Sequence, residues 1–145
     1  KENYFLDDGA YMSVKILCEV VKCKRAGKSI EDLLNGLEEA VDCGEFRLGI
    51  QLEEFKEYGL KVLEDFKAFA ESQETFHIVE PNYEGVRISF NDEEVHGWLL
   101  LRLSLHDPIL PMNIETNEAG GVAKVLDRIR PFFEKYESLN ISSLK

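Results

Sequence analysis

Hydrophobic and polar positions follow a helical period through the first forty residues. Apolar residues recur at helical spacing over 11–21, after an Asp7-Asp8-Gly9 turn whose carboxylates can cap a helix. Ser29 followed by Asp32 has the spacing of a capping box and predicts a second, short helix. The helical period is lost over 41–45. We therefore place a domain boundary there.

Beyond that boundary the period alternates between strand and helix. Helical spacing predicts a helix over Leu52–Ala70 and a last helix that begins at Thr116 or Asn117. The polar tail from Glu137 is expected to fray. This order indicates an α+β fold in which two helices cover one face of an antiparallel sheet. Short apolar or alternating stretches predict the strands, at 46–50, 76–79, 85–90, 98–103 and 109–114.

Composition and charge narrow the possible partners. Hydrophobic residues make up 44% and charged residues 31%, as in a folded globular protein. The net charge is −11, and such an acidic surface repels a nucleic-acid backbone, so we expect no nucleic-acid partner. The longest apolar run, Trp98–Leu101, is too short to span a bilayer, and no membrane partner is expected. Because the chain opens at Lys1 rather than Met, we expect a piece of a longer protein whose targeting region is absent.

The cysteines do not point to a metal or redox site. Cys18, Cys23 and Cys43 are odd in number, and their spacing fits neither a zinc knuckle nor a Cys-x-x-Cys pair. They are predicted to be buried, reduced thiols of an intracellular protein.

Candidate chemistry lies at the end of the strand predicted over 98–103. Arg102 and Ser104 are two residues apart and point the same way in an extended chain, and His106 follows. A guanidinium can grip two phosphate oxygens while a hydroxyl, an imidazole and free backbone N–H groups bind the others. Arg102 is the only permanent cation of this loop. The alternative is an ordinary loop whose Arg pairs with a surface acid, and spacing alone leaves both interpretations open.

Several motifs in order resemble the last domain of the α-D-phosphohexomutases, the phosphoglucomutase and phosphomannomutase family. They are Gly85-Val86-Arg87, Gly97-Trp98 and the loop Arg102-Leu103-Ser104-Leu105-His106-Asp107-Pro108, which is similar to the family's Arg-x-Ser-Asn-Thr-Glu-Pro. The Asp7-Asp8-Gly9 turn and its helix resemble the end of the family's third domain. The resemblance thus implies that residues 1–42 are a helical remnant of that α/β, sugar-binding domain, and that residues 43–145 are the C-terminal phosphate-binding domain.

The resemblance also implies a chemistry. These enzymes interconvert hexose 1-phosphate and 6-phosphate through a bisphosphate intermediate, using a phosphoserine in the first domain and Mg²⁺ held by the second. Arg102, Ser104 and His106 would bind the substrate phosphate, with no catalytic or metal-binding residue in this chain, which alone is predicted to be inactive. The implied partners are a hexose phosphate and the preceding domains of the same polypeptide. The implied location is intracellular, in the cytoplasm or an organelle such as the plastid.

The chain also departs from the family pattern. Leu105 replaces an Asn and cannot donate a hydrogen bond, His106 replaces a Thr, and Asp107 replaces a Glu. Asn113 stands where some members carry a further Arg on the next strand. Two other functions therefore stay open beside the mutase fragment: a non-catalytic anion- or phosphosugar-binding module, and an α+β interaction domain.

Overall fold

The computed structural model describes residues 8–37 and 39–145. The chain divides into two compact units, Lys1–Glu38 (unit 1) and Glu39–Lys145 (unit 2), and each is described by itself. The assignment of the two parts to the third and last domains of a mutase stays a prediction.

Unit 1 contains the two helices that the sequence predicts. Helix α1 spans Gly9–Arg25, and the Asp8 carboxylate caps it by accepting a 3.0 Å hydrogen bond from the Tyr11 N–H. The second helix, η1 (Ile30–Leu34), is a 3₁₀ helix with the expected capping box, in which the Asp32 carboxylate accepts from the Ser29 N–H at 2.8 Å. Asp7, the other predicted capping residue, lies outside the described residues.

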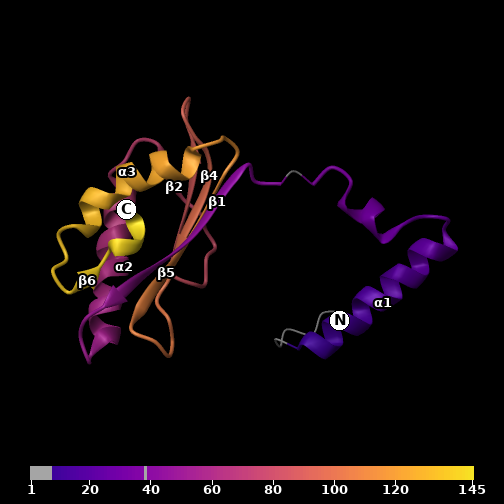
Figure 1. Ribbon diagram of the computed structural model, residues 1–145, viewed down its shortest axis with the longest axis horizontal. Helices are drawn as coiled ribbons and strands as arrows, with labels where there is room; N and C mark the ends of the chain where they lie inside the picture. The colour runs from indigo at the N-terminus through magenta and orange to yellow at the C-terminus, as the bar shows by residue number, and fades with distance from the viewer. Residues whose placement is uncertain (1–7, 38) are drawn as a thin grey trace. The chain divides into compact units, whose positions relative to one another are not determined.

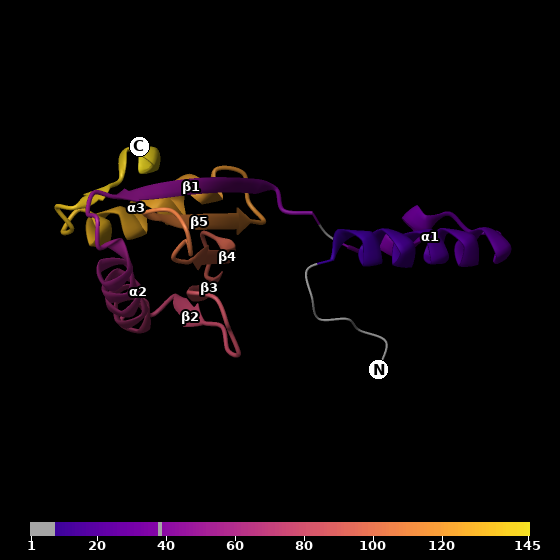
Figure 2. The same ribbon diagram turned by 90° about the horizontal axis from the view of Figure 1, so that it is seen from below.

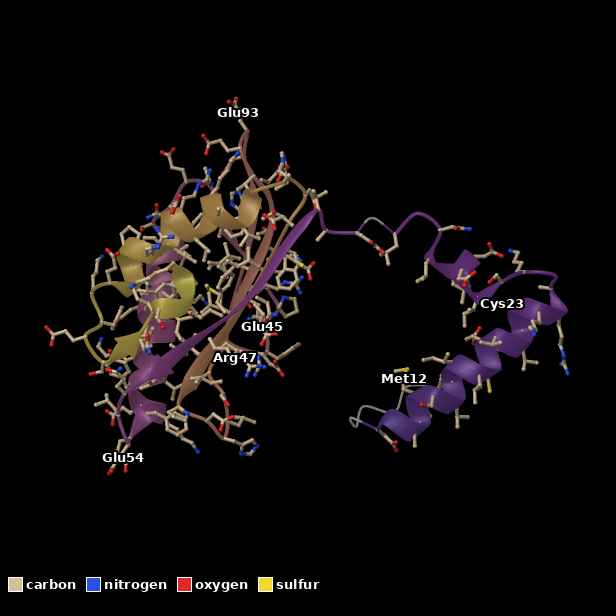
Figure 3. All side chains as sticks on the ribbon, viewed as in Figure 1. Met12, Cys23, Glu45, Arg47, Glu54 and Glu93 are labelled. Carbon is tan, nitrogen blue, oxygen red and sulfur yellow. The ribbon has the colours of Figure 1, made fainter. Side chains whose placement is uncertain are left out.

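The apolar side chains of unit 1 are largely exposed. Cys23 is the one residue of α1 that is buried, and η1 has none. Figure 3 labels Cys23 and the exposed Met12 on α1. An amphipathic helix of this kind normally covers a sheet or another helix. Among the described residues of the unit, the exposed large apolar ones are Met12, Val14, Ile16, Leu17, Val21, Leu33, Leu34 and Leu37.

Unit 2 is built on one antiparallel sheet in the order β2-β3-β4-β5-β1-β6 (Figures 1 and 2). The predicted α+β class and antiparallel sheet are confirmed. The strands are β1 (Asp42–Ile50), β2 (Phe76–Ile78), β3 (Val86–Asn91), β4 (His96–Leu101), β5 (Ile109–Thr116) and β6 (Leu139–Asn140).

Helices α2 (Phe55–Glu71) and α3 (Gly121–Phe133) lie on the same face of this sheet (Figure 1). Helix α3 packs over β1 and β5, and α2 packs over β2 and β3. Alternate strand residues point into the core under the helices, such as Leu48 in β1 and Ile88 in β3. Between the helices, Phe66 stacks on Phe133 with ring centroids 5.3 Å apart. The other sheet face carries polar side chains, and Figure 3 shows Glu45 and Arg47 on it.

The start of α3 differs from the sequence prediction. Thr116 belongs to β5, and the helix is preceded by Gly120, whose φ of 75° is a left-handed conformation that favours glycine. A Cβ on Gly121 would lie 2.3 Å from the Thr116 Oγ1, so only a glycine lets the helix begin this close to the strand. The prediction of a Thr116 or Asn117 cap was wrong because β5 continues through Thr116 and the cap is Gly120.

The C-terminal tail is ordered, against the prediction that it frays from Glu137. Strand β6 pairs with the end of β1, and the Leu144 side chain is completely buried. The Arg130 guanidinium donates two hydrogen bonds, of 3.1 and 3.0 Å, to the Leu144 carbonyl. Burial of one leucine and this charge-assisted anchor hold a segment whose composition is polar.

Other elements are offset from their predicted positions. β1 begins at Asp42, inside the predicted boundary, because it pairs with β5 along its length from Asp42 opposite Thr116. All three cysteines are free thiols, but Cys18 and Cys43 are exposed, so the prediction of burial holds for Cys23 alone. Among the described residues, no helix is both long enough and apolar enough to cross a membrane.

Candidate functional site

A hollow of about 480 Å³ opens at one end of unit 2, beside the segment that follows β4. Three pieces of chain form it: the first turns of α2, the turn before β3, and residues 102–105. Figure 3 shows Glu54, just before α2, at this end of the unit, and Glu93, in the β3–β4 connection, at the other. The lining residues are Lys56, Leu60, Leu63, Tyr83, Glu84, Gly85, Arg102, Leu103, Ser104 and Leu105.

Arg102 is half-buried in the wall of this hollow. Strand β4 ends at Leu101, but the pairing with β5 continues, since the Arg102 N–H donates to the Pro111 carbonyl at 3.0 Å. Its backbone is therefore held by the sheet. Among the described residues, no carboxylate lies within ion-pair distance of its guanidinium. The alternative, an ordinary loop, requires a surface acid paired with Arg102, and the described residues provide none.

Gly85 sets the contact between the turn before β3 and Arg102. It has a φ of 67°, and a Cβ there would lie 2.1 Å from the Leu101 carbonyl oxygen and 2.7 Å from the Arg102 Cα. Backbone meets backbone at this point, so a side chain could not be accommodated by a simple rotation. The glycine of the Gly-Val-Arg motif thus packs directly against the residue predicted to bind phosphate.

Ser104 organises the loop after β4. Its N–H donates to the Ile109 carbonyl at 3.1 Å, and its Oγ accepts from the N–H groups of His106 at 3.4 Å and Asp107 at 3.1 Å. Two of the backbone donors that sequence analysis counted as free are therefore occupied. The Ser104 O–H proton is still available to a ligand, and the Leu105 N–H has no partner among the described residues.

His106 lies apart from the other two predicted site residues. Its side chain is exposed and does not line the hollow, whereas Arg102 and Ser104 both do. Leu105 lines it with an apolar side chain that is 78% exposed. Asn113, at the position where some phosphohexomutases carry a further Arg, does not line this hollow.

Lys56 is a lining residue that sequence analysis missed. It lies in the first turn of α2 and brings a second permanent cation to the hollow, so Arg102 is not the only one there. No spacing rule connects Lys56 with Arg102, because the two come to line the same hollow only when α2 packs on the sheet. Gly59, one turn further along α2, lies against the Leu103 side chain, since a Cβ there would lie 2.5 Å from Leu103 Cδ1. Glu84 adds one acid to the same lining.

Among the described residues, a carboxyl group with a strongly lowered pKa, that of Asp92, lies away from the hollow. Asp92, in the β3–β4 connection, pairs with Arg128 of α3 at 2.5 Å, and Arg128 also pairs with Glu94 at 2.8 Å. The Arg128 hydrogen bond, aided by the N–H groups of Glu94 and Val95, holds the pKa of Asp92 well below its usual range. These charges fasten the β3–β4 connection to α3.

The Mg²⁺ that the resemblance implies finds no set of ligands in this part of the chain. Among residues 8–37 and 39–145, no three His, Cys, Asp or Glu side chains gather closely enough to hold a metal ion.

Comparison with known proteins gives a similarity of fold. No protein-family model matches the chain, and no curated protein is similar to it in sequence. A crystal structure of a phosphoglucomutase/phosphomannomutase family protein from Burkholderia thailandensis matches with a TM-score of 0.61 and 23% sequence identity. The chain has the fold of part of that protein. The match covers 92% of this chain and 25% of the other, so the chain spans about a quarter of the neighbour's length.

Proposed function

We propose that this chain is the C-terminal part of a phosphohexomutase and that its hollow binds a phosphate group of a hexose phosphate. The observation that carries the proposal is Arg102, a half-buried residue that lines the hollow and whose guanidinium has no ion-pair partner among the described residues. A guanidinium so placed is suited to a bidentate grip on a phosphate. The likeness in fold to a phosphoglucomutase/phosphomannomutase family protein supports the assignment.

Each residue has a definite part in this binding. Arg102 holds two phosphate oxygens, and the Ser104 hydroxyl and the Leu105 N–H donate to the remaining oxygen. Ser104 also fixes the turn, because its Oγ accepts from two backbone N–H groups. His106 acts from outside the hollow, where a ring N–H can donate one further hydrogen bond.

The remaining chemistry belongs to the preceding domains of the parent polypeptide. A phosphoserine there would exchange the phosphoryl group, and Mg²⁺ bound by those domains would supply neutralisation of its charge. This chain contributes the grip on the phosphate that is not reacting, and alone it is expected to show no mutase turnover.

A titration followed by amide ¹H–¹⁵N spectra tests the proposal on this chain. Glucose 6-phosphate and glucose 1-phosphate should cause saturable shifts at Gly85 and at 102–105, and glucose without phosphate should cause none. Absence of saturable shifts, or shifts confined to the exposed sheet face around Arg47, would contradict it. A non-catalytic binding module would give the same shifts, so the parent gene must then be read. A phosphorylatable serine loop and an aspartate-rich metal site upstream distinguish the mutase.

A further inference from the structure

We infer that Lys56 is the second cation of this site and makes the hollow selective for the dianion of a phosphate monoester; the inference rests on the proposed function. Lys56 comes from α2, Arg102 from the segment after β4, and both line the same hollow. Among the described residues, neither cation has an ion-pair partner. Two unpaired cations in one concavity favour a ligand group that carries two negative charges.

The remaining lining offers few other donors. Four of the lining residues are leucines, and the N–H groups of His106 and Asp107 already donate to Ser104. A phosphate monoester presents three strongly accepting oxygens, more than one guanidinium and one hydroxyl can saturate. Lys56 supplies three further N–H donors on a flexible stem. Lys56 therefore offsets the loss of the side-chain amide donor that an Asn would provide in place of Leu105.

Glu84 acts in the opposite direction. Glu84 belongs to the same lining, so the lining residues of the hollow include two cations and one acid, a formal charge of +1. The apolar walls lower the local dielectric constant and strengthen both the attraction and the repulsion. Removal of Lys56 should therefore weaken the binding of a dianion, and removal of the Glu84 charge should strengthen it.

The test is a set of dissociation constants for glucose 6-phosphate and glucose 6-sulfate at pH 7.5 and low salt. At this pH the phosphate ester is largely a dianion, whereas the sulfate ester keeps one charge. Lys56→Gln should weaken phosphate-ester binding about three- to fivefold and reduce the preference for phosphate over sulfate. Glu84→Gln should tighten it about twofold to threefold. The matched control is Lys61→Gln, on the same helix, exposed, and outside the hollow, which should change neither constant.

The results distinguish a failure of the Lys56 inference from a failure of the proposed phosphate site. If Arg102→Ala weakens binding and Lys56→Gln behaves like Lys61→Gln, the Lys56 inference is wrong and the phosphate site stands. If Lys56→Gln weakens binding and Arg102→Ala does not, Lys56 is supported and the role of Arg102 falls. No saturable binding of glucose 6-phosphate to the unchanged chain would overturn both. Lys56 is exposed, so Lys56→Gln should leave the fold unchanged, and an unchanged ¹H–¹⁵N spectrum of each variant verifies this.

Discussion

At the scale of single residues, the site depends on close contact between two backbone segments, at Gly85 and at Leu101–Arg102. Gly85 is in a left-handed conformation and leaves no room for a Cβ beside Leu101 and Arg102. Gly120 has a similar φ, of 75°, but a Cβ there would meet nothing within 4 Å. The two glycines therefore separate the cost of the backbone conformation from the cost of the contact.

Gly85→Ala should weaken the binding of glucose 6-phosphate at least tenfold, because the added methyl group displaces the backbone of Arg102. It should also cost more stability than Gly120→Ala, whose left-handed strain costs about 1–2 kcal/mol. Urea unfolding and the binding titration on both variants check this. Equal losses of stability, with binding intact in both, would show that the contact at Gly85 does not hold Arg102.

Sequence spacing could predict part of this site. Arg102 and Ser104 share one side of an extended segment, and the structure brings both to the hollow. His106 and Lys56 were beyond such reasoning for opposite reasons. The turn that Ser104 organises leaves His106 outside, and the packing of α2 brings Lys56 in.

At the scale of elements, the β3–β4 connection is fastened to α3 by charge. Arg128 of α3 binds Asp92 and Glu94, and the Lys124 ammonium donates to the Glu94 carbonyl at 3.2 Å. Asp92 and Arg128 are mostly buried, at 14% and 26% side-chain exposure. A pair so placed contributes more than an exposed ion pair, because each hydrogen bond joins charged groups away from water.

Asp92→Asn should lower the free energy of unfolding at pH 7 by about 1.5–3 kcal/mol. The pKa of Asp92 is lowered in the folded state, chiefly by Arg128, so its contribution is full above its unfolded pKa and is lost as the pH falls through its folded pKa. The difference between the two proteins should therefore shrink as the pH falls below about 4. Glu93→Gln, on the same connection, is the control. A difference that stays constant down to pH 2 would contradict the charge-based explanation.

At the same scale, the C-terminal tail is held to unit 2 by the buried Leu144 side chain. Leu144→Ala should destabilise unit 2 by about 2–4 kcal/mol, because its side chain is fully buried beside Arg130. Leu52→Ala, at an exposed leucine, should cost less than about 1 kcal/mol. Chemical unfolding of both variants measures the difference. Similar losses in the two would mean that the tail frays, as its polar composition suggested.

Periodicity identified the helices and most of the strands because each of them buries alternate or helically spaced residues. It failed where strand pairing or a single close contact decides. The short strand β6 is defined by its pairing with β1, and α3 begins at Gly121 because that glycine fits against Thr116. Neither contact leaves a periodic signal in the sequence.

At the scale of the whole molecule, the two units differ in how they bury apolar residues. Unit 2 has a continuous core under two helices, whereas Val14, Leu17 and Val21 of α1 are exposed. Limited proteolysis should therefore remove residues before Glu39 first and leave a fragment that begins near the boundary of unit 2. Mass spectrometry of a time course identifies the fragments. If α1 resists cleavage for as long as α2 does, the expectation that unit 2 outlasts the residues before Glu39 is wrong.

The central claim is that Arg102 binds phosphate, and one pair of measurements on three proteins tests it most directly. Arg102→Ala should weaken binding of glucose 6-phosphate by about 1.5–3 kcal/mol, roughly ten- to a hundredfold, with a Tm within about 2 °C of the unchanged chain. Arg102→Lys should recover only part of the affinity, because an ammonium keeps the charge without the two-pronged geometry. An unchanged affinity together with a clearly lower Tm for Arg102→Ala would show that this arginine is structural, and would contradict the proposed site.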